Sequence, residues 1–118
     1  MAGRSALAAL LVVLLASACT RAPRTDELAK IATLAPSIML KADSSNEIQQ
    51  ADWPQALAKL QPERVYVRPE GLYIVLSSFF VEERGVFVPR SPDFVPSTGS
   101  DPSYTSTGPG IFAYRIKG

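Results

Sequence analysis

The sequence contains no histidine in its 118 residues. Histidine is the commonest general base and the commonest metal ligand at neutral pH, so its absence excludes every His-containing triad and the usual zinc sites. No glycine-rich phosphate loop and no calcium-loop spacing is present either. We therefore expect a protein that is not an enzyme, with no catalytic residues, no metal and no cofactor.

Cysteine occurs only once, as Cys19, so no disulfide can form within the chain. Neither sign of charge is in excess, because the chain has 12 basic and 11 acidic residues and a formal net charge of +1. Without a basic excess we expect no nucleic-acid partner. The uncharged run from Ser5 to Thr20, extended as a helix, covers about 24 Å, which is shorter than the hydrocarbon core of a bilayer.

That uncharged run instead has the features of a secretory signal. Arg4 supplies the positive start, an apolar stretch follows, and Ala16-Ser17-Ala18 precede Cys19. The stretch resembles the lipobox of bacterial lipoproteins, although the family prefers Leu where this chain has Ala16. The resemblance implies cleavage after residue 18 and acylation of Cys19. Ala16-Ser17-Ala18 also fits the ordinary signal peptidase, which would leave a free thiol at Cys19.

The lipoprotein resemblance also implies a location. An acylated Cys19 would tether the mature chain to a membrane of the bacterial cell envelope. Thr20, rather than Asp, follows the cysteine, and in that family this favours the outer membrane, facing the periplasm, over the inner membrane. We therefore expect a signal peptide over 1–18, a lipidated N-terminus and linker over 19–25, and one domain over 26–118.

Two short helices are predicted at the start of that domain. Thr25 fits an N-cap, and Leu28, Ile31 and Ala35 form an apolar stripe that Pro36 should end. Residues 37–42 remain ambiguous, a short strand being one interpretation, and 43–51 are a polar loop. A second helix should begin with Asp52 as its N-cap and end before residue 62, with Trp53 as a core anchor.

The rest of the domain predicts an antiparallel sheet of about four strands. Alternation or apolar character marks strands over 64–68, 72–81, 86–88 and 111–117. Gly71 and Gly85 each follow three residues that suit a type I turn, which predicts three-residue links between the first three strands. Segment 89–110, in which 16 of 22 residues are Pro, Gly, Ser or Thr, should be a long loop held by Phe94 and Tyr104. The fold class is α+β.

Three-residue links would place Arg68 opposite Leu72 and Glu82 opposite Val86. One sheet face, expected beneath the helices, then carries Val65, Val67, Tyr73, Val75, Ser77, Phe79, Val81 and Phe87. The other face carries Arg64, Tyr66, Arg68, Leu72, Ile74, Leu76, Ser78, Phe80 and Val88. Glu82 and Glu83 fall in an exposed turn, where their role would be solubility.

Arg64, Tyr66 and Arg68 are the candidate partner-binding residues, since two guanidinium groups beside a tyrosine suit an acidic peptide. The alternative is that these arginines only cover apolar neighbours. Residues 52–88 also resemble segments of small bacterial lipoproteins, which implies no activity. We expect an accessory or protein-interaction lipoprotein with an envelope partner. The alternatives are a binder of a small ligand or lipid on the second sheet face, and a secreted, non-lipidated inhibitor or immunity-type protein.

Overall fold

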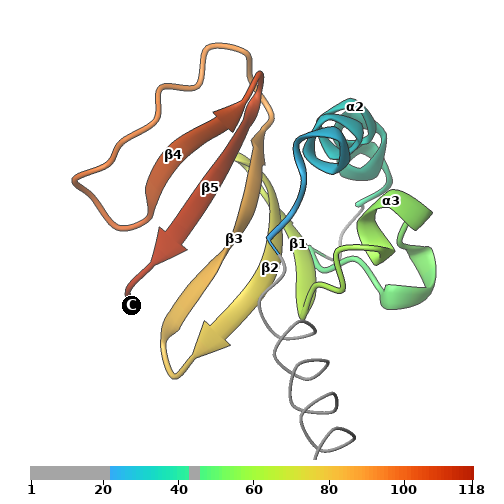
Figure 1. Ribbon diagram of the computed structural model, residues 1–118, viewed down its shortest axis with the longest axis horizontal. Helices are drawn as coiled ribbons and strands as arrows, with labels where there is room; N and C mark the ends of the chain where they lie inside the picture. The colour runs from blue at the N-terminus through green and yellow to red at the C-terminus, as the bar shows by residue number, and fades with distance from the viewer. Residues whose placement is uncertain (1–21, 43–45) are drawn as a thin grey trace, which may run out of the picture.

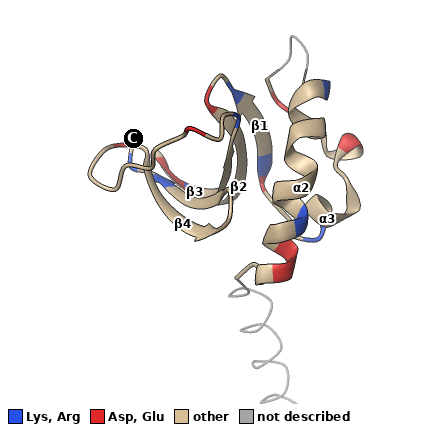
Figure 2. Cartoon of the chain, turned by 90° about the horizontal axis from the view of Figure 1, so that it is seen from above, with Lys and Arg blue, Asp and Glu red and all other residues tan. Residues whose placement is uncertain are grey.

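A computed structural model describes residues 22–42 and 46–118, and the predictions for residues 1–18 and Cys19 lie outside this part of the chain. Helices lie on one side of a curved antiparallel sheet (Figures 1 and 2). The elements in chain order are α2 (Thr25–Lys41), the 3₁₀ turn η1 (Gln50–Asp52), α3 (Gln55–Ala58), β1 (Arg64–Arg68), β2 (Gly71–Phe79), β3 (Glu82–Pro89), β4 (Ser103–Gly108) and β5 (Ile111–Ile116). The predicted α+β class is confirmed, with five strands in the described residues instead of four.

Helix α2 continues through Pro36, so the prediction that this proline ends the helix is wrong, as is the strand interpretation of 37–42. An internal proline loses one hydrogen bond and costs about 3 kcal/mol. Burial of Ile38 and Met39 offsets that cost, because each large apolar side chain removed from water gives about 1.5–3 kcal/mol. The helix begins one residue earlier than predicted, with Arg24 at the N-cap position, where its backbone N–H donates to Glu27 at 2.9 Å.

The second predicted helix is shorter than expected. Asp52 belongs to η1 and is not the N-cap of α3, because that position is held by Pro54. Helix α3 has a single turn. Leu57, a residue of this turn, is fully buried. Trp53 packs against the core, and its Nε1 donates to the Ile48 carbonyl at 3.1 Å. The anchoring role predicted for Trp53 is therefore confirmed. The helix cannot continue past Gln61, whose φ is +52°, and Pro62 has no N–H to donate to a further turn.

The sheet has the order β1-β2-β3-β5-β4, and every neighbouring pair is antiparallel. Both predicted links are wrong. Arg68 pairs with Gly71, so the first link is 69–70, one residue shorter than predicted, and Phe79 pairs with Glu82, so the second link is 80–81 and not 83–85. Gly71 is part of β2, and only glycine fits there because a Cβ would overlap the Val88 carbonyl oxygen of the adjacent strand.

This change of register redistributes the predicted sheet faces, because successive residues of a strand point to opposite faces. The face beneath α2 and α3 carries Val65, Val67, Leu72, Ile74, Val86, Val88 and Ile111. The opposite face carries an aromatic cluster, which we define as Tyr66, Tyr73, Phe87, Phe94, Tyr104, Phe112 and Tyr114. Both faces are therefore covered, one by helices and one by its own rings and the loop.

The segment 89–110 is only partly a loop. Its Ser/Thr-rich end, Ser103–Gly108, forms β4 against β5, which alternation in polarity alone does not predict. The predicted attachment of the loop is confirmed, since Phe94 and Tyr104 lie 5.1 and 4.8 Å from the Phe87 ring centroid. Within the described ranges, none of the helices has the length and apolar character needed to cross a membrane.

Candidate functional site

The three predicted site residues come together on β1. The Arg64 and Arg68 guanidinium carbons lie 5.2 and 5.3 Å from the centroid of the Tyr66 ring, within the range of a cation–π contact. We call these residues the arginine–tyrosine strip. Tyr66 itself is only 6% exposed, because its ring also stacks on Tyr73 at 5.0 Å. A partner would therefore contact the arginines and not the tyrosine.

The two arginines differ in their other contacts. Arg64 Nε lies 2.8 Å from the Glu47 carboxylate. Glu47 belongs to a short segment that pairs with the edge of β1 through the Asn46 carbonyl and the Ile48 N–H. Arg68 is exposed and takes part in none of the ion pairs formed between the described residues. Arg90 lies beside it, because its Nη2 donates to the Arg68 carbonyl at 3.2 Å. Arg68 is thus the member of the strip with the most capacity for a partner's carboxylate.

Glu83 is a site residue that the sequence interpretation missed. It lies within β3 and accepts hydrogen bonds from the hydroxyls of Tyr66 at 2.5 Å and Tyr114 at 2.8 Å. Its assignment to an exposed turn is therefore wrong, because the turn is formed by Phe80 and Val81. No sequence signal marks it, because Tyr66 and Tyr114 lie 17 and 31 residues away and only the strand pairing brings them to Glu83.

The tyrosines of the aromatic cluster are the only four in the chain, and the pKa of each is raised. Burial is the main cause for all four. The Glu83 carboxylate raises the pKa of Tyr66 and Tyr114 further. Tyr104 and Glu70 raise the pKa of Tyr73 in the same way. The Tyr73 hydroxyl lies 2.7 Å from the Tyr104 hydroxyl and donates to Glu70 at 2.8 Å. The cluster is therefore a set of neutral hydroxyls that does not titrate near physiological pH.

We expect the domain to lose stability in alkali. Above about pH 10 the unfolded chain releases its tyrosine protons, whereas the folded chain with raised pKa values retains them, so the free energy of unfolding falls as pH rises. Tyrosinate absorbance should appear together with the loss of circular dichroism. If the tyrosines of the folded protein titrated at about pH 10, their hydroxyls would not be buried, and the prediction would be wrong.

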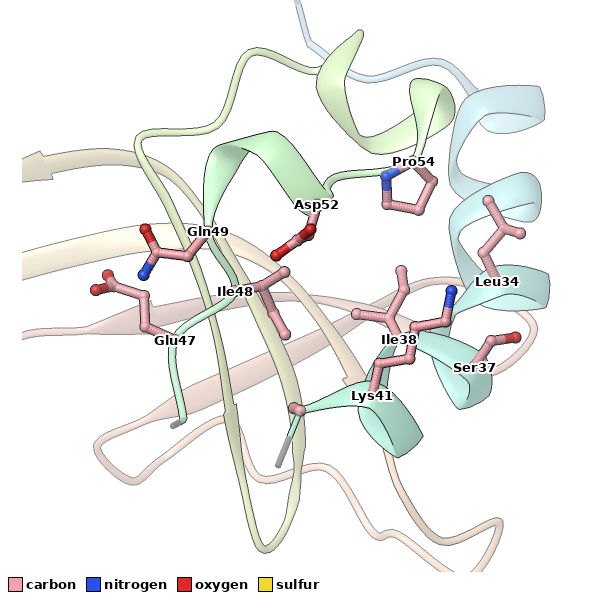
Figure 3. A pocket seen from close by; sticks show the side chains of 10 residues that line it. Leu34, Ser37, Ile38, Lys41, Glu47, Ile48, Gln49, Asp52 and Pro54 are labelled. Carbon is pink, nitrogen blue, oxygen red and sulfur yellow. The ribbon is translucent and has the colours of Figure 1, made fainter. Parts of the chain in front are cut away.

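A cavity of about 740 Å³ lies between the C-terminal half of α2 and the chain around η1 (Figure 3). Leu34, Ile38, Ile48 and Pro54 supply its apolar lining, and Lys41 is one of its charged residues (Figure 3). Of the residues predicted for the second sheet face, Leu72 and Ile74 are fully buried in the core beneath the helices, whereas Phe80 is exposed. Binding of a small ligand on that face stays a prediction.

Other polar side chains of the described residues make local hydrogen bonds. Ser78 Oγ donates to the Glu63 carboxylate at 3.0 and 3.1 Å, and both residues are exposed. Asp101 accepts the backbone N–H groups of Lys117 and Gly118, which ties the end of the chain to the loop. In the part of the chain that is described, no three Asp, Glu or Cys side chains gather as a metal site.

The comparisons give no family for this chain. It matches no protein-family model, no curated protein and no solved structure.

Proposed function

We propose that the chain is a cell-envelope lipoprotein, tethered through Cys19 at the outer membrane facing the periplasm, whose domain is a non-catalytic protein-interaction module. The sequence Ala16-Ser17-Ala18-Cys19 supports the tether. The observation that carries the interaction function is the position of Arg68. Its guanidinium is exposed, held over the Tyr66 ring and free of any ion pair formed between the described residues.

Stacking prepares Arg68 for a partner. A guanidinium offers a planar fork of N–H donors that fits a carboxylate with two parallel hydrogen bonds. Contact with the Tyr66 ring restricts the side chain before binding, so less rotamer entropy is lost when a partner arrives. Arg90 adds a second cation at the same end of β1. An acidic segment of an envelope protein is the partner that this arrangement suits.

Crosslinking in living cells, with the native N-terminus intact, tests this proposal. We expect capture of one reproducible protein, and we expect Arg68→Ala to weaken binding of the purified partner about tenfold, as for an interfacial arginine worth 1–2 kcal/mol. The melting temperature should hardly change, because the Arg68 side chain is exposed. The intact mass of the same material should show acyl groups on Cys19.

Arg84→Ala is the matched control, because Arg84 is also an exposed strand arginine but pairs with Glu82 at 2.8 Å. It should leave partner binding unchanged. An equal loss for both variants would indicate a nonspecific charge effect and contradict a site at Arg68. An unmodified thiol at Cys19 would contradict the tether and leave the interaction function standing.

A further inference from the structure

The turn between β2 and β3 exposes three consecutive large apolar residues. Phe79, Phe80 and Val81 are 73%, 91% and 71% exposed. The two phenyl rings lie edge to face with their centroids 4.5 Å apart, so they form one apolar tip. We define the hairpin tip as these three residues. Exposed apolar residues that stand together mark a surface that contacts another body.

The hairpin tip projects beyond its neighbours. Pairing with β1 stops at Val75, and pairing with β5 stops at Glu83, so the last residues of the β2–β3 hairpin have no strand on either side. Figure 1 shows this hairpin extending past the ends of β1 and β5. The tip therefore projects from the end of the sheet.

Phe80 adds a conformational cost to this exposure. Its φ angle is +56°, in the left-handed region that a bulky residue adopts at a cost and that glycine adopts freely. With 91% of its surface exposed, its side chain repays little of that cost through burial. A strained residue that contributes so little to the core points to a role outside the fold.

We infer that the hairpin tip inserts into the interfacial region of the lipid bilayer that carries the protein. This inference rests on the proposed tether, because it names a second contact of the same domain with the same membrane. From Cys19 to Ala22 the chain spans at most about 11 Å, so an acylated Cys19 would hold the domain close to the surface. The described chain starts on the side of α2 toward the β2–β3 turn (Figure 1).

The charges behind the tip fit a headgroup layer. Arg84 and Arg115 both direct Nε toward Glu82, at 2.8 and 2.9 Å, directly behind the exposed rings. Each guanidinium has further N–H donors that can reach lipid phosphates. Because Glu82 partly balances the two cations, the apolar rings supply most of the attraction. Interfacial binding grows with the apolar area buried among the lipids and with the attraction of cations to anionic headgroups, and the hairpin tip with Arg84 and Arg115 supplies both.

Tryptophan reporters test the depth of the tip. The full chain is purified with its native N-terminus and reconstituted into vesicles of phosphatidylethanolamine and phosphatidylglycerol that carry a doxyl-labelled lipid. Phe80→Trp places a reporter at the tip, and Val95→Trp is the matched control at another residue, 81% exposed, in the loop before β4. We expect the Phe80→Trp emission to shift to the blue and to lose about half its added intensity. The Val95→Trp emission should behave as in water.

A second variant separates insertion from folding. Phe80→Gly removes the ring and the strained conformation, so it should raise the melting temperature by a few degrees. A lower melting temperature would assign Phe80 to the fold and overturn the inference. Equal quenching of the Phe80 and Val95 reporters would do the same.

The intact mass of each sample distinguishes this inference from the tether. Acylated Cys19 with a Phe80→Trp reporter that stays in water overturns insertion and leaves the tether standing, and the tip would then be a contact for a protein. An unmodified Cys19 with a quenched reporter overturns the tether while the tip still inserts.

Discussion

Replacing Glu83 with alanine should lower the free energy of unfolding by about 2–4 kcal/mol, because two buried tyrosine hydroxyls lose their acceptor. Tyr66 and Tyr114, which are 6% and 3% exposed, both donate to Glu83. Water has little access to either ring, so the hydroxyls cannot find equivalent partners. Urea denaturation followed by circular dichroism measures the change.

Glu82→Ala is the matched control for this prediction. Glu82 is the adjacent carboxylate, but it accepts from Arg84 and Arg115 on an exposed surface, where ion pairs contribute little. It should therefore change stability only slightly. Glu83→Gln, which keeps an acceptor oxygen, should fall between the two alanine variants. Equal effects of Glu82→Ala and Glu83→Ala would show that the tyrosine contacts do not stabilise the fold.

Gly85→Ala should cost about 3 kcal/mol or more, a large part of the stability of a small domain. A Cβ on Gly85 would overlap the Ile74 carbonyl oxygen and lie 2.9 Å from the Ile74 carbonyl carbon and 3.0 Å from the Leu76 nitrogen. All three atoms belong to the backbone of β2, so relief requires the central strands to separate. The midpoint of thermal unfolding should fall accordingly.

Gly99→Ala provides the comparison, because a Cβ there meets no atom within 4 Å. It should leave the midpoint unchanged or raise it slightly, through the smaller entropy of the unfolded chain. The Gly85 result also tests the register. With the three-residue link predicted from sequence, Gly85 would occupy a left-handed turn position, where alanine would cost only about 1–2 kcal/mol. A loss that small would contradict the strand pairing.

Several elements follow from the sequence alone because their patterns are physically distinctive. Period-two alternation located β1 and β5 nearly to the residue, and the apolar run after Gly71 located β2. The apolar stripe of α2 was visible as well, but it continued past Pro36 to Ile38 and Met39. The error there came from treating one lost hydrogen bond as decisive when two buried side chains outweighed it.

The register could not be derived from the sequence. Glycine after three turn-like residues suits a left-handed turn position, yet Gly71 and Gly85 serve close approaches between strands instead. The left-handed position of the second turn is held by Phe80, a residue that no propensity assigns there. A shift of one residue at the first turn exchanged the two faces of β2 relative to β1, and the second turn moved from 83–85 to 80–81.

The part of the candidate site that does not depend on the register could be predicted from the sequence. Arg64, Tyr66 and Arg68 share a face because they alternate within one strand, whatever the register of its neighbours. Glu83 depends on the pairing of β3 with both β2 and β5, so it was invisible until the register was known. The exposure of the hairpin tip likewise depends on where two other strands end.

The position of β5 determines when the domain can fold. This strand, Ile111–Ile116, lies between β3 and β4, so among the described strands β4 is connected to the rest of the sheet only through β5. A chain emerging from the ribosome, N-terminus first, cannot close the sheet until β5 has emerged. In the export that the proposed tether requires, the sheet likewise cannot close until β5 has crossed the membrane.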